Sequence, residues 1–288
     1  MKIQDSELIL NKDGSIYHLN LLPEQIAPII ITVGDQDRVA MVSRYFDRIE
    51  HQVRKREFVT HTGWLGKTRL SVLSTGIGPD NIDIVMNELD ALVNIDLYSR
   101  ELRPTPTALT IIRLGTAGGL QAEVPVDNFV ASTGGIGLDG LLQFYNAPEQ
   151  HQHPVVQALR NHFAGRWNFP VAPYYAEADP ELLQTFSSGF YQGFTATNPG
   201  FYGPQGRQLR APVQIPEYLD LLQKFSFDGT TILNLEMETA ALFGLSKLLG
   251  HRAISLSAII ANRPLKKFST DPRRAVQKLI EQVLEAIG

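Results

Sequence analysis

The sequence contains no cysteine among its 288 residues, and it has no long apolar run. The first absence excludes disulfides, thiolate metal clusters and cysteine nucleophiles from the chemistry of this chain. The second predicts no membrane-spanning helix, since a span needs about 18 or more apolar residues. The N-terminal segment also lacks the basic start and apolar core of a signal peptide. These features predict a cytoplasmic protein.

An excess of positive charge is also missing. The chain has 26 Lys and Arg residues against 30 Asp and Glu residues, which gives a formal net charge of −4. We therefore expect no basic field that would attract nucleic acid or an anionic membrane, and any anionic ligand must be bound locally. A hydrophobic content of 43% is enough to bury a large core.

Short apolar segments alternate with segments of helical periodicity along most of the chain. The expected strands are Pro28–Val33, Arg69–Leu73, Ala108–Leu114, Asn128–Ser132, Gly193–Thr197, Thr231–Leu235 and Ala253–Ala261. The expected helices are Arg38–Phe46, Pro79–Val93, Pro154–Phe163, Pro216–Phe225, Met237–Leu249 and Pro272–Ile287.

Phe58–Gly66 and Lys67–Ser74 surround a Gly-containing turn and indicate an antiparallel pair. Asn146–Gln152 and Asn198–Arg210 have the composition of loops. The whole pattern predicts one α/β domain over residues 1–288, with a central mixed β-sheet flanked by helices.

The first segment that indicates chemistry follows an apolar strand. Gly34 and Asp35 form a turn that leads into a helix carrying Arg38. Backbone N–H groups at such a helix start favour an anion, and Arg38 adds a full positive charge. The alternative is an ordinary strand–turn–helix connection in which Asp35 caps the helix.

A second segment places Arg113 at the end of an apolar strand, directly before a turn containing Gly115, Thr116, Gly118 and Gly119. A buried guanidinium group needs an anionic partner. The hydroxyl group and the glycines would let an oxyanion approach the backbone closely. This pattern predicts an oxyanion cradle, and the alternative is a salt bridge from Arg113 to a buried carboxylate.

A third segment, Glu236-Met237-Glu238, places two carboxylates at the start of a helix that follows an apolar strand. A carboxylate at the end of a strand can accept two hydrogen bonds from a vicinal diol such as the ribose hydroxyls, and its charge favours a cationic sugar transition state. The alternative is that these acids only stabilise the helix start, by about 0.3–1 kcal/mol.

A fourth segment is the loop that carries Phe201, Gln205 and Arg207. Residues two apart in an extended loop point to the same side. Gln205 offers one acceptor and two donors, while Arg207 offers donors only, and together they match the edge of a pyrimidinedione. Phe201 could lie against the flat base. The alternative is a solvated Gly/Pro loop.

At these residues the chain resembles the nucleoside phosphorylase family, and in particular its uridine phosphorylases. The resemblance covers nearly the whole chain and includes Tyr17-His18-Leu19, Val33-Gly34-Asp35 with Arg38, Arg56-Glu57-Phe58, Ser74-Thr75-Gly76-Ile77-Gly78, Arg113 with Gly115-Thr116, Phe201 to Arg207, Glu236-Met237-Glu238 and Ile260-Ala261-Asn262-Arg263. It implies an α/β fold with a mixed sheet and a pentosyltransferase that phosphorolyses a pyrimidine nucleoside, above all uridine, to the free base and ribose 1-phosphate. It also implies no organic cofactor, inorganic phosphate as co-substrate, and a homo-oligomer of dimers with shared active sites.

The resemblance implies a role for each matching position. Phosphate would be bound by Gly34, Arg38, Arg113 and Thr116, with Arg56 reaching in from the neighbouring subunit. Ribose would be bound by Glu236, Met237 and Glu238, with His18 of the neighbour near the 5′-hydroxyl. The base would be bound by Phe201, Gln205, Arg207, Ile260, Ala261 and Arg263. Catalysis would rest on Arg113, Glu238, Gln205 and Arg207, with no metal in the chemistry, while Glu57 and Ser74 could help to hold a structural monovalent cation between subunits.

The sequence departs from the family pattern in two places. Purine-specific bacterial relatives have an Asp after the penultimate strand, whereas Ser257–Asn262 contains no carboxylate, which favours a pyrimidine. Gly78 is followed by Pro79-Asp80-Asn81, where many uridine phosphorylases have a second Gly, then Pro and Ser. The sequence therefore does not predict whether this helix start contacts phosphate or a neighbouring subunit. The alternative functions are a purine nucleoside phosphorylase or nucleosidase on the same fold, or a catalytically silent nucleoside-binding protein. The preference among uridine, deoxyuridine and thymidine also stays open.

Overall fold

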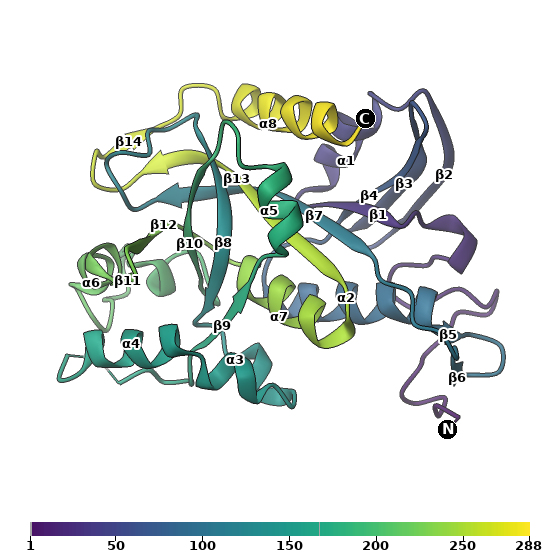
Figure 1. The fold of residues 1–288 in the computed structure, drawn as a ribbon, viewed down its shortest axis with the longest axis horizontal. Helices are drawn as coiled ribbons and strands as arrows, with labels where there is room; N and C mark the ends of the chain where they lie inside the picture. Colours follow the sequence, from purple (N-terminus) through teal and green to yellow (C-terminus); the bar gives the residue numbers. More distant parts are fainter. Residues whose placement is uncertain (1, 167) are drawn as a thin grey trace.

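The structure is a computed structural model that describes residues 2–166 and 168–288. Figure 1 shows a twisted β-sheet with helices on both of its sides. The strands are β1 (Ile29–Val33), β2 (Arg48–Lys55), β3 (Phe58–Leu65), β4 (Thr68–Ser74), β5 (Ile95–Asp96), β6 (Glu101–Leu102), β7 (Thr110–Gly119), β8 (Phe129–Gly137), β9 (Tyr174–Glu177), β10 (Tyr191–Thr197), β11 (Ser226–Phe227), β12 (Thr230–Glu236), β13 (Arg252–Asn262) and β14 (Lys267–Phe268).

Most helices lie between these strands in the chain. The helices are α1 (Gln36–Ser43), α2 (Pro79–Asn94), α3 (Pro148–Gln152), α4 (Pro154–Phe163), α5 (Pro180–Thr185), α6 (Tyr218–Lys224), α7 (Thr239–Leu249) and α8 (Pro272–Ile287), with short 3-10 helices η1 (Pro23–Gln25), η2 (Leu141–Phe144) and η3 (Gly203–Gln205). Of these, η1 precedes β1 and α8 follows β14. In Figure 1, α8 lies on one side of the sheet, and α2 and α7 lie on the other.

The main sheet is mixed, as the sequence predicts. Its strand order is β11-β12-β10-β8-β13-β7-β1-β4-β3-β2, with parallel pairing of β7 to both β1 and β13 and antiparallel pairing along β4, β3 and β2. In addition, β12 returns to pair with β7, so that Asn234 lies opposite Gly119 and Leu235 opposite Gly118. The strands β7, β13, β8, β10 and β12 therefore form a closed ring, which the sequence patterns did not predict.

Proline marks three helix starts that the sequence predicts correctly. The helices α4 and α8 have the predicted bounds, and α2 begins at the predicted Pro79 and ends one residue later than expected. Proline fits there because the first turn of a helix does not use its N–H groups in internal hydrogen bonds. Each helix buries an apolar face in the core, as α8 does with Ala275, Leu279 and Val283.

Other predicted bounds are wrong. The strand expected to end at Leu114 continues as β7 through Gly119, so the predicted glycine turn is extended strand. It continues because β13 pairs with it as far as Gly119 and β12 pairs with its last two residues. The segment 146–152, expected to be a loop, contains α3, and β2, β9 and α5 were not predicted.

This topology places one end of the sheet around a shared space. In the parallel pair of β1 and β7, Val33 lies opposite Leu114, so β7 runs five residues beyond the end of β1. The turn after β1, the last residues of β7 and the end of β12 at Glu236 are therefore neighbours. The space outside the carboxyl ends of such strands is where α/β proteins bind ligands.

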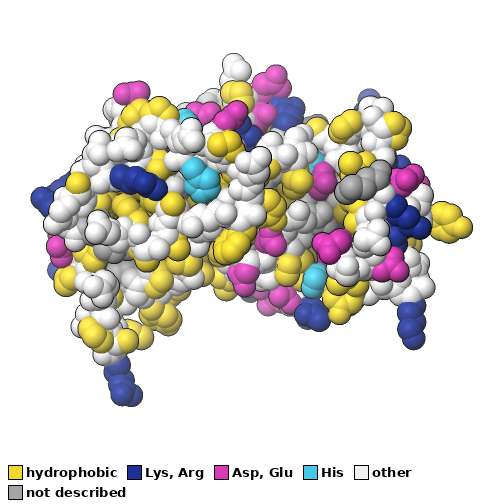
Figure 2. Space-filling model, turned by 90° about the horizontal axis from the view of Figure 1, so that it is seen from below, with side chains coloured by type: hydrophobic (Ala, Val, Ile, Leu, Met, Phe, Trp, Pro, Cys, Tyr) yellow, Lys and Arg dark blue, Asp and Glu magenta, His cyan; other side chains and the backbone are white. Residues whose placement is uncertain are grey.

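Charged side chains are mixed on the surface. On the face drawn in Figure 2, Lys and Arg side chains are scattered and interleaved with acidic ones. Among the residues that the structure describes, no helix has the length and apolar character needed to cross a bilayer.

Candidate active site

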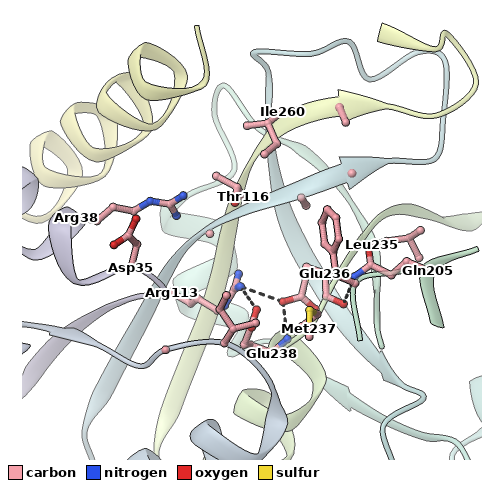
Figure 3. A pocket seen from close by; sticks show the side chains of 18 of the residues that line it. Asp35, Arg38, Arg113, Thr116, Gln205, Leu235, Glu236, Met237, Glu238 and Ile260 are labelled. Atoms are coloured by element: carbon pink, nitrogen blue, oxygen red, sulfur yellow. Dashed lines mark hydrogen bonds and ion pairs between the residues drawn. The ribbon is translucent and has the colours of Figure 1, made fainter. Parts of the chain in front are cut away.

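A cavity of about 900 Å³ opens at this end of the sheet. Its volume lies in the range that small-molecule sites usually have. Twelve of the residues assigned to ligands by the family resemblance line it: Gly34, Arg38, Arg113, Thr116, Phe201, Gln205, Arg207, Glu236, Met237, Glu238, Ile260 and Ala261. Segments far apart in the sequence thus meet in one place, as Figure 3 shows.

Arg113 lies at the buried end of the cavity. One of its nitrogens, Nη2, donates to Glu238 Oε2 and lies 3.2 Å from Glu236 Oε2. The alternative predicted from the sequence, a salt bridge from Arg113 to a buried carboxylate, is therefore present. Burial opposes the charge of Arg113, but the two carboxylates outweigh it and raise the pKa of the guanidinium.

The second terminal nitrogen of Arg113, Nη1, is buried and has no hydrogen-bond partner among the described residues. A side-chain carbon on residue 115 would lie 1.9 Å from this nitrogen, so Gly115 is needed to make room for the guanidinium group. An unpaired buried donor costs about 1–3 kcal/mol, and a charged donor costs more. Nη1 is thus a charged donor that the described residues leave without a partner at the end of the cavity.

Arg38 approaches the same end of the cavity from the first turn of α1. Asp35 caps this helix by accepting a hydrogen bond of 3.0 Å from the N–H of Asp37, so the capping alternative is also correct. Burial lowers the pKa of Arg38, and the nearby charge of Arg113 acts in the same direction. An anion between the two guanidinium groups would relieve both effects. In Figure 3, Thr116 lies beyond the tip of Arg38.

The two carboxylates have different surroundings. Glu236 Oε2 accepts hydrogen bonds of 2.9 Å from the N–H groups of Glu238 and Thr239, and its Oε1 accepts one of 2.6 Å from the hydroxyl of Thr197. Glu236 therefore stabilises the start of α7, which is the alternative role that the sequence analysis gave for these acids. With these contacts and Arg113, its carboxylate has few acceptor positions left.

Glu238 has fewer hydrogen-bond partners than Glu236. Its Oε2 accepts from Arg113, and its Oε1 accepts a hydrogen bond of 2.8 Å from the N–H of Gly78. Burial raises the pKa of Glu238, Arg113 lowers it, and Glu236 raises it further, with a net upward shift. Each oxygen still has an acceptor position, so Glu238 is the carboxylate that can bind a diol.

The loop residues Gln205 and Arg207 meet as predicted, but not through an extended backbone. Gln205 belongs to η3, and Gly206 has a left-handed conformation. Arg207 Nη1 donates to Gln205 Oε1 at 2.7 Å and to the Phe201 carbonyl at 2.6 Å, while its guanidinium stacks 3.8 Å from the centre of the Phe201 ring. Burial, together with Arg263, lowers the pKa of Arg207 to about 10.

The position of Gln205 excludes the alternative of a fully solvated loop. Its side chain is 3% exposed, and its Nε2 lies 3.5 Å from the carbonyl of Glu236. Gln205 is thus tied to the strand that carries the carboxylates. In Figure 3, Gln205 lies on the side of the cavity opposite to Arg38.

Three predicted residues do not line this cavity. Arg56 is exposed at the turn between β2 and β3, and His18 lies 2.7 Å from Glu88 through its Nδ1. Arg263 lies behind the loop, 3.5 Å from the carbonyl of Gly206. Of the two positions suggested for a cation, Glu57 lines the cavity, whereas the hydroxyl of Ser74 accepts from Val59 and donates to the Glu57 carbonyl.

Other lining residues were not predicted. Phe268 lines the cavity although its side chain is 64% exposed, because β14 pairs with β13 and places Phe268 opposite Ala261. Asn81 lines it from the first turn of α2. Local sequence holds no signal for Phe268, since its place depends on a pairing between two strands.

The fold and the site define an enzyme of a known class. Residues 28–287 match the family model of the phosphorylase superfamily, and the chain belongs to this family. The resemblance stated from the sequence and the predicted fold class are thereby confirmed.

Individual relatives have names that are more specific than the name of the superfamily. The uridine phosphorylase of Thermococcus kodakarensis is 27% identical over 270 residues, which are 93% of this chain and 84% of that protein. The uridine phosphorylase of Treponema pallidum is 29% identical over 248 residues, which are 86% of this chain and 82% of that protein. A crystal structure of a Trypanosoma brucei nucleoside phosphorylase, described as showing uridine phosphorylase activity, superposes with a TM-score of 0.87 at 29% identity and covers 97% of this chain and 98% of that one.

Proposed function

We propose that this chain catalyses the phosphorolysis of uridine, or of a closely related pyrimidine nucleoside, to the free base and ribose 1-phosphate. The observation that carries the proposal is that two arginines, Arg38 and Arg113, line one cavity together with Glu238, to which Arg113 donates through Nη2. An anion donor site and a diol acceptor site are therefore adjacent. The relatives named above act on uridine according to their names, and this supports the base assignment.

Phosphate would be the nucleophile, so the reaction needs no nucleophilic side chain. A phosphate oxygen held by Arg113, Arg38, Gly34 and Thr116 forms a bond to the anomeric carbon on the face opposite to the base. The N-glycosidic bond breaks, and its electron pair stays on the base, which takes up the proton that the attacking hydrogen phosphate loses and so becomes the free pyrimidine. The ribose is positive in the transition state, and the bound phosphate and Glu238 stabilise that charge.

The base end would stabilise the leaving group. Negative charge develops on the pyrimidine ring as the bond breaks, and donors from Gln205 and Arg207 at the ring edge oppose it. Their mutual hydrogen bond of 2.7 Å fixes the orientation of the Gln205 amide, with its NH₂ group directed away from Arg207. This orientation matches an acceptor on the base.

The test is an ultraviolet assay of nucleoside cleavage with and without phosphate, run on uridine, deoxyuridine, thymidine, inosine and adenosine. We expect phosphate-dependent cleavage of uridine that survives chelators. Equal turnover in phosphate-free buffer would show a nucleosidase, preference for inosine or adenosine would show a purine enzyme, and binding without cleavage would show a silent nucleoside-binding protein.

We also propose that the active unit is at least a dimer with shared sites. Arg56 and His18 lie outside the cavity of their own chain, and Arg56 is exposed on a hairpin turn with its carbonyl 3.2 Å from Gln36 Nε2. In a two-fold dimer each would complete the neighbour's site.

Complementation between two inactive variants tests the shared site. Arg56→Ala lacks the donated guanidinium but keeps Glu238, whereas Glu238→Ala can still donate Arg56. Random reassortment of equal amounts makes about half of the dimers mixed, and each mixed dimer has one intact site, so about a quarter of all sites should become active. The chains must be refolded together so that subunits exchange. Verified mixed dimers without activity would contradict the shared site.

A further inference from the structure

The main-chain N–H of Gly78 connects two parts of the molecule that are 160 residues apart in sequence, by donating to Glu238 Oε1 at 2.8 Å. Gly78 precedes the first residue of α2 and caps that helix without a side chain. Its φ of 99° and ψ of 164° lie in a region that is essentially restricted to glycine. Only glycine directs the N–H at this position toward α7 without strain.

The two donors on Glu238 fix the whole carboxylate group. Arg113 holds Oε2 and Gly78 holds Oε1, so the plane of the carboxylate cannot rotate without losing one of the two bonds. Glu238 is 6% exposed, and water has little access that could replace a lost donor. Arg113 would also contact phosphate, which leaves the Gly78 bond as the contact dedicated to Glu238.

We infer that Gly78 is a positioning residue, whose amide orients Glu238 so that one oxygen faces each of the two ribose hydroxyls. This inference rests on the proposed function, because it concerns the diol of the nucleoside. A carboxylate with one fixed donor on each oxygen presents its remaining acceptor positions in one direction, as recognition of a vicinal diol requires.

Asn81 supports the turn from the next helical residues. Its Nδ2 lies 3.4 Å from the carbonyl of Ile77, and a side-chain carbon on residue 76 would lie 2.3 Å from this nitrogen. The Asn81 amide therefore packs directly against the turn Gly76–Gly78. In this chain Asn81 belongs to the segment that departs from the pattern of many uridine phosphorylases, and here it holds the turn that positions Glu238.

The test is Gly78→Ala, assayed on uridine, 2′-deoxyuridine and 3′-deoxyuridine with saturating phosphate. A side chain at position 78 is strained at the φ of 99°, and its first carbon would lie 2.8 Å from Asp80 Oδ1. We expect the backbone to shift in order to relieve this strain, which moves the N–H away from Glu238. A shift of about 1 Å can cost about 100-fold in rate. We expect kcat for uridine to fall about 10- to 100-fold, and the loss to be clearly smaller for each deoxynucleoside, because one of the oriented hydrogen bonds is already missing.

The matched control is Gly14→Ala. Gly14 also has a positive φ, of 84°, but a side-chain carbon there meets no atom within 4 Å. We expect this variant to lose stability without any dependence on the sugar hydroxyls. Comparing each variant with wild type on the same nucleoside also removes the different intrinsic reactivity of the deoxy sugars.

A second variant, Asn81→Ala, covers the case in which Gly78→Ala does not fold. It keeps Gly78 and weakens only the support of the turn, so a smaller loss with the same dependence on the hydroxyls is expected. An equal loss on all three nucleosides, or a Gly78→Ala enzyme that behaves like Gly14→Ala, would overturn the inference. If the wild-type chain itself fails to cleave uridine with phosphate, the proposed function fails first.

Discussion

Two arginines on neighbouring strands each contact two carboxylates, yet their surroundings differ. Arg113 on β7 contacts Glu236 and Glu238, and Arg252 on β13 contacts Asp179 and Glu181. The Arg252 side chain is 39% exposed, and its Nε and Nη2 both bind carboxylate oxygens at 2.9–3.0 Å. The Arg113 side chain is 8% exposed, and a single nitrogen serves both of its carboxylates.

The difference separates an ion pair at the surface from a buried one that lines the cavity. The Arg252 cluster pairs its charges at the surface, where such contacts contribute about 0–1 kcal/mol. The Arg113 cluster is buried, and its charged donor Nη1 has no partner among the described residues, which costs about 1–3 kcal/mol or more. Counting salt bridges would treat the two clusters alike, whereas the burial of Arg113 and its place at the cavity distinguish them.

The largest expected effect comes from Arg113→Ala, with Arg252→Ala as its matched control. Loss of Arg113 leaves two buried carboxylates without a cation, so we expect the free energy of unfolding to fall by about 3–5 kcal/mol. The phosphorolysis of uridine should fall below detection. For Arg252→Ala we expect stability to change by about 1 kcal/mol or less, with unchanged kcat/KM. Urea unfolding and steady-state kinetics measure both, and similar losses in the two variants would remove the distinction.

Within the Arg113 cluster, we expect the two carboxylates to have different roles: Glu236 stabilises the start of α7, and Glu238 binds the ribose. For Glu238→Gln we expect kcat to fall about 100- to 1000-fold, since a charge opposite the transition state is lost. For Glu236→Gln we expect mainly a loss of stability of about 1–3 kcal/mol, because this carboxylate accepts from two N–H groups at the start of α7. If both variants lose activity equally at equal stability, the division of roles is wrong.

A third arginine, Arg207, differs from both Arg113 and Arg252 in its partners. It is half-buried, and its hydrogen bonds go to neutral groups of its own loop. We expect Arg207→Ala and Gln205→Ala to lower kcat/KM for uridine by about 10- to 1000-fold while the KM for phosphate stays unchanged. The control is Leu209→Ala in the same loop, because this side chain is 74% exposed and does not line the cavity. Wild-type kinetics in both loop variants would contradict the assignment of base recognition.

The smallest expected effect is the pH dependence of the surface cluster. The hydrogen bonds from Arg252 hold the pKa of Asp179 below its usual value of 3.8. A lowered pKa in the folded state means that the stabilisation is complete above pH 3.8 and is lost as the pH falls through the folded value. The difference in unfolding free energy between wild type and Arg252→Ala should therefore be constant from about pH 7 to 5 and shrink in more acidic buffer. A difference that stays constant down to pH 2 would show that charge does not cause it.

Local patterns predict the helices better than the strands. Proline at the first position gave the starts of α2, α4 and α8, because that preference is local and strong. The end of β7 was missed because Gly115, Gly118 and Gly119 favour a turn when read alone. In the folded chain these glycines pair with β13 and β12 and leave room for Arg113, and this tertiary reason is invisible in a local window.

The site followed the same rule. Residues in contiguous motifs, such as Gln205 with Arg207, were predicted to lie together and do so. The bond between Gly78 and Glu238 joins two motifs and depends on the orientation of a single N–H, which residue types do not encode. Phe268 likewise reaches the cavity only through strand pairing.

The closed ring of β7, β13, β8, β10 and β12 has a consequence for how the chain opens. In an open sheet an outer strand can slide or detach by itself, but in a ring the pairing register of each strand is tied to all the others. Arg113 and Glu236 lie on two strands of this ring, so local fluctuations cannot separate them. We therefore expect hydrogen exchange of their amides to require global unfolding, and exchange in the loop of Gln205 and Arg207, which lies outside the ring, to be faster.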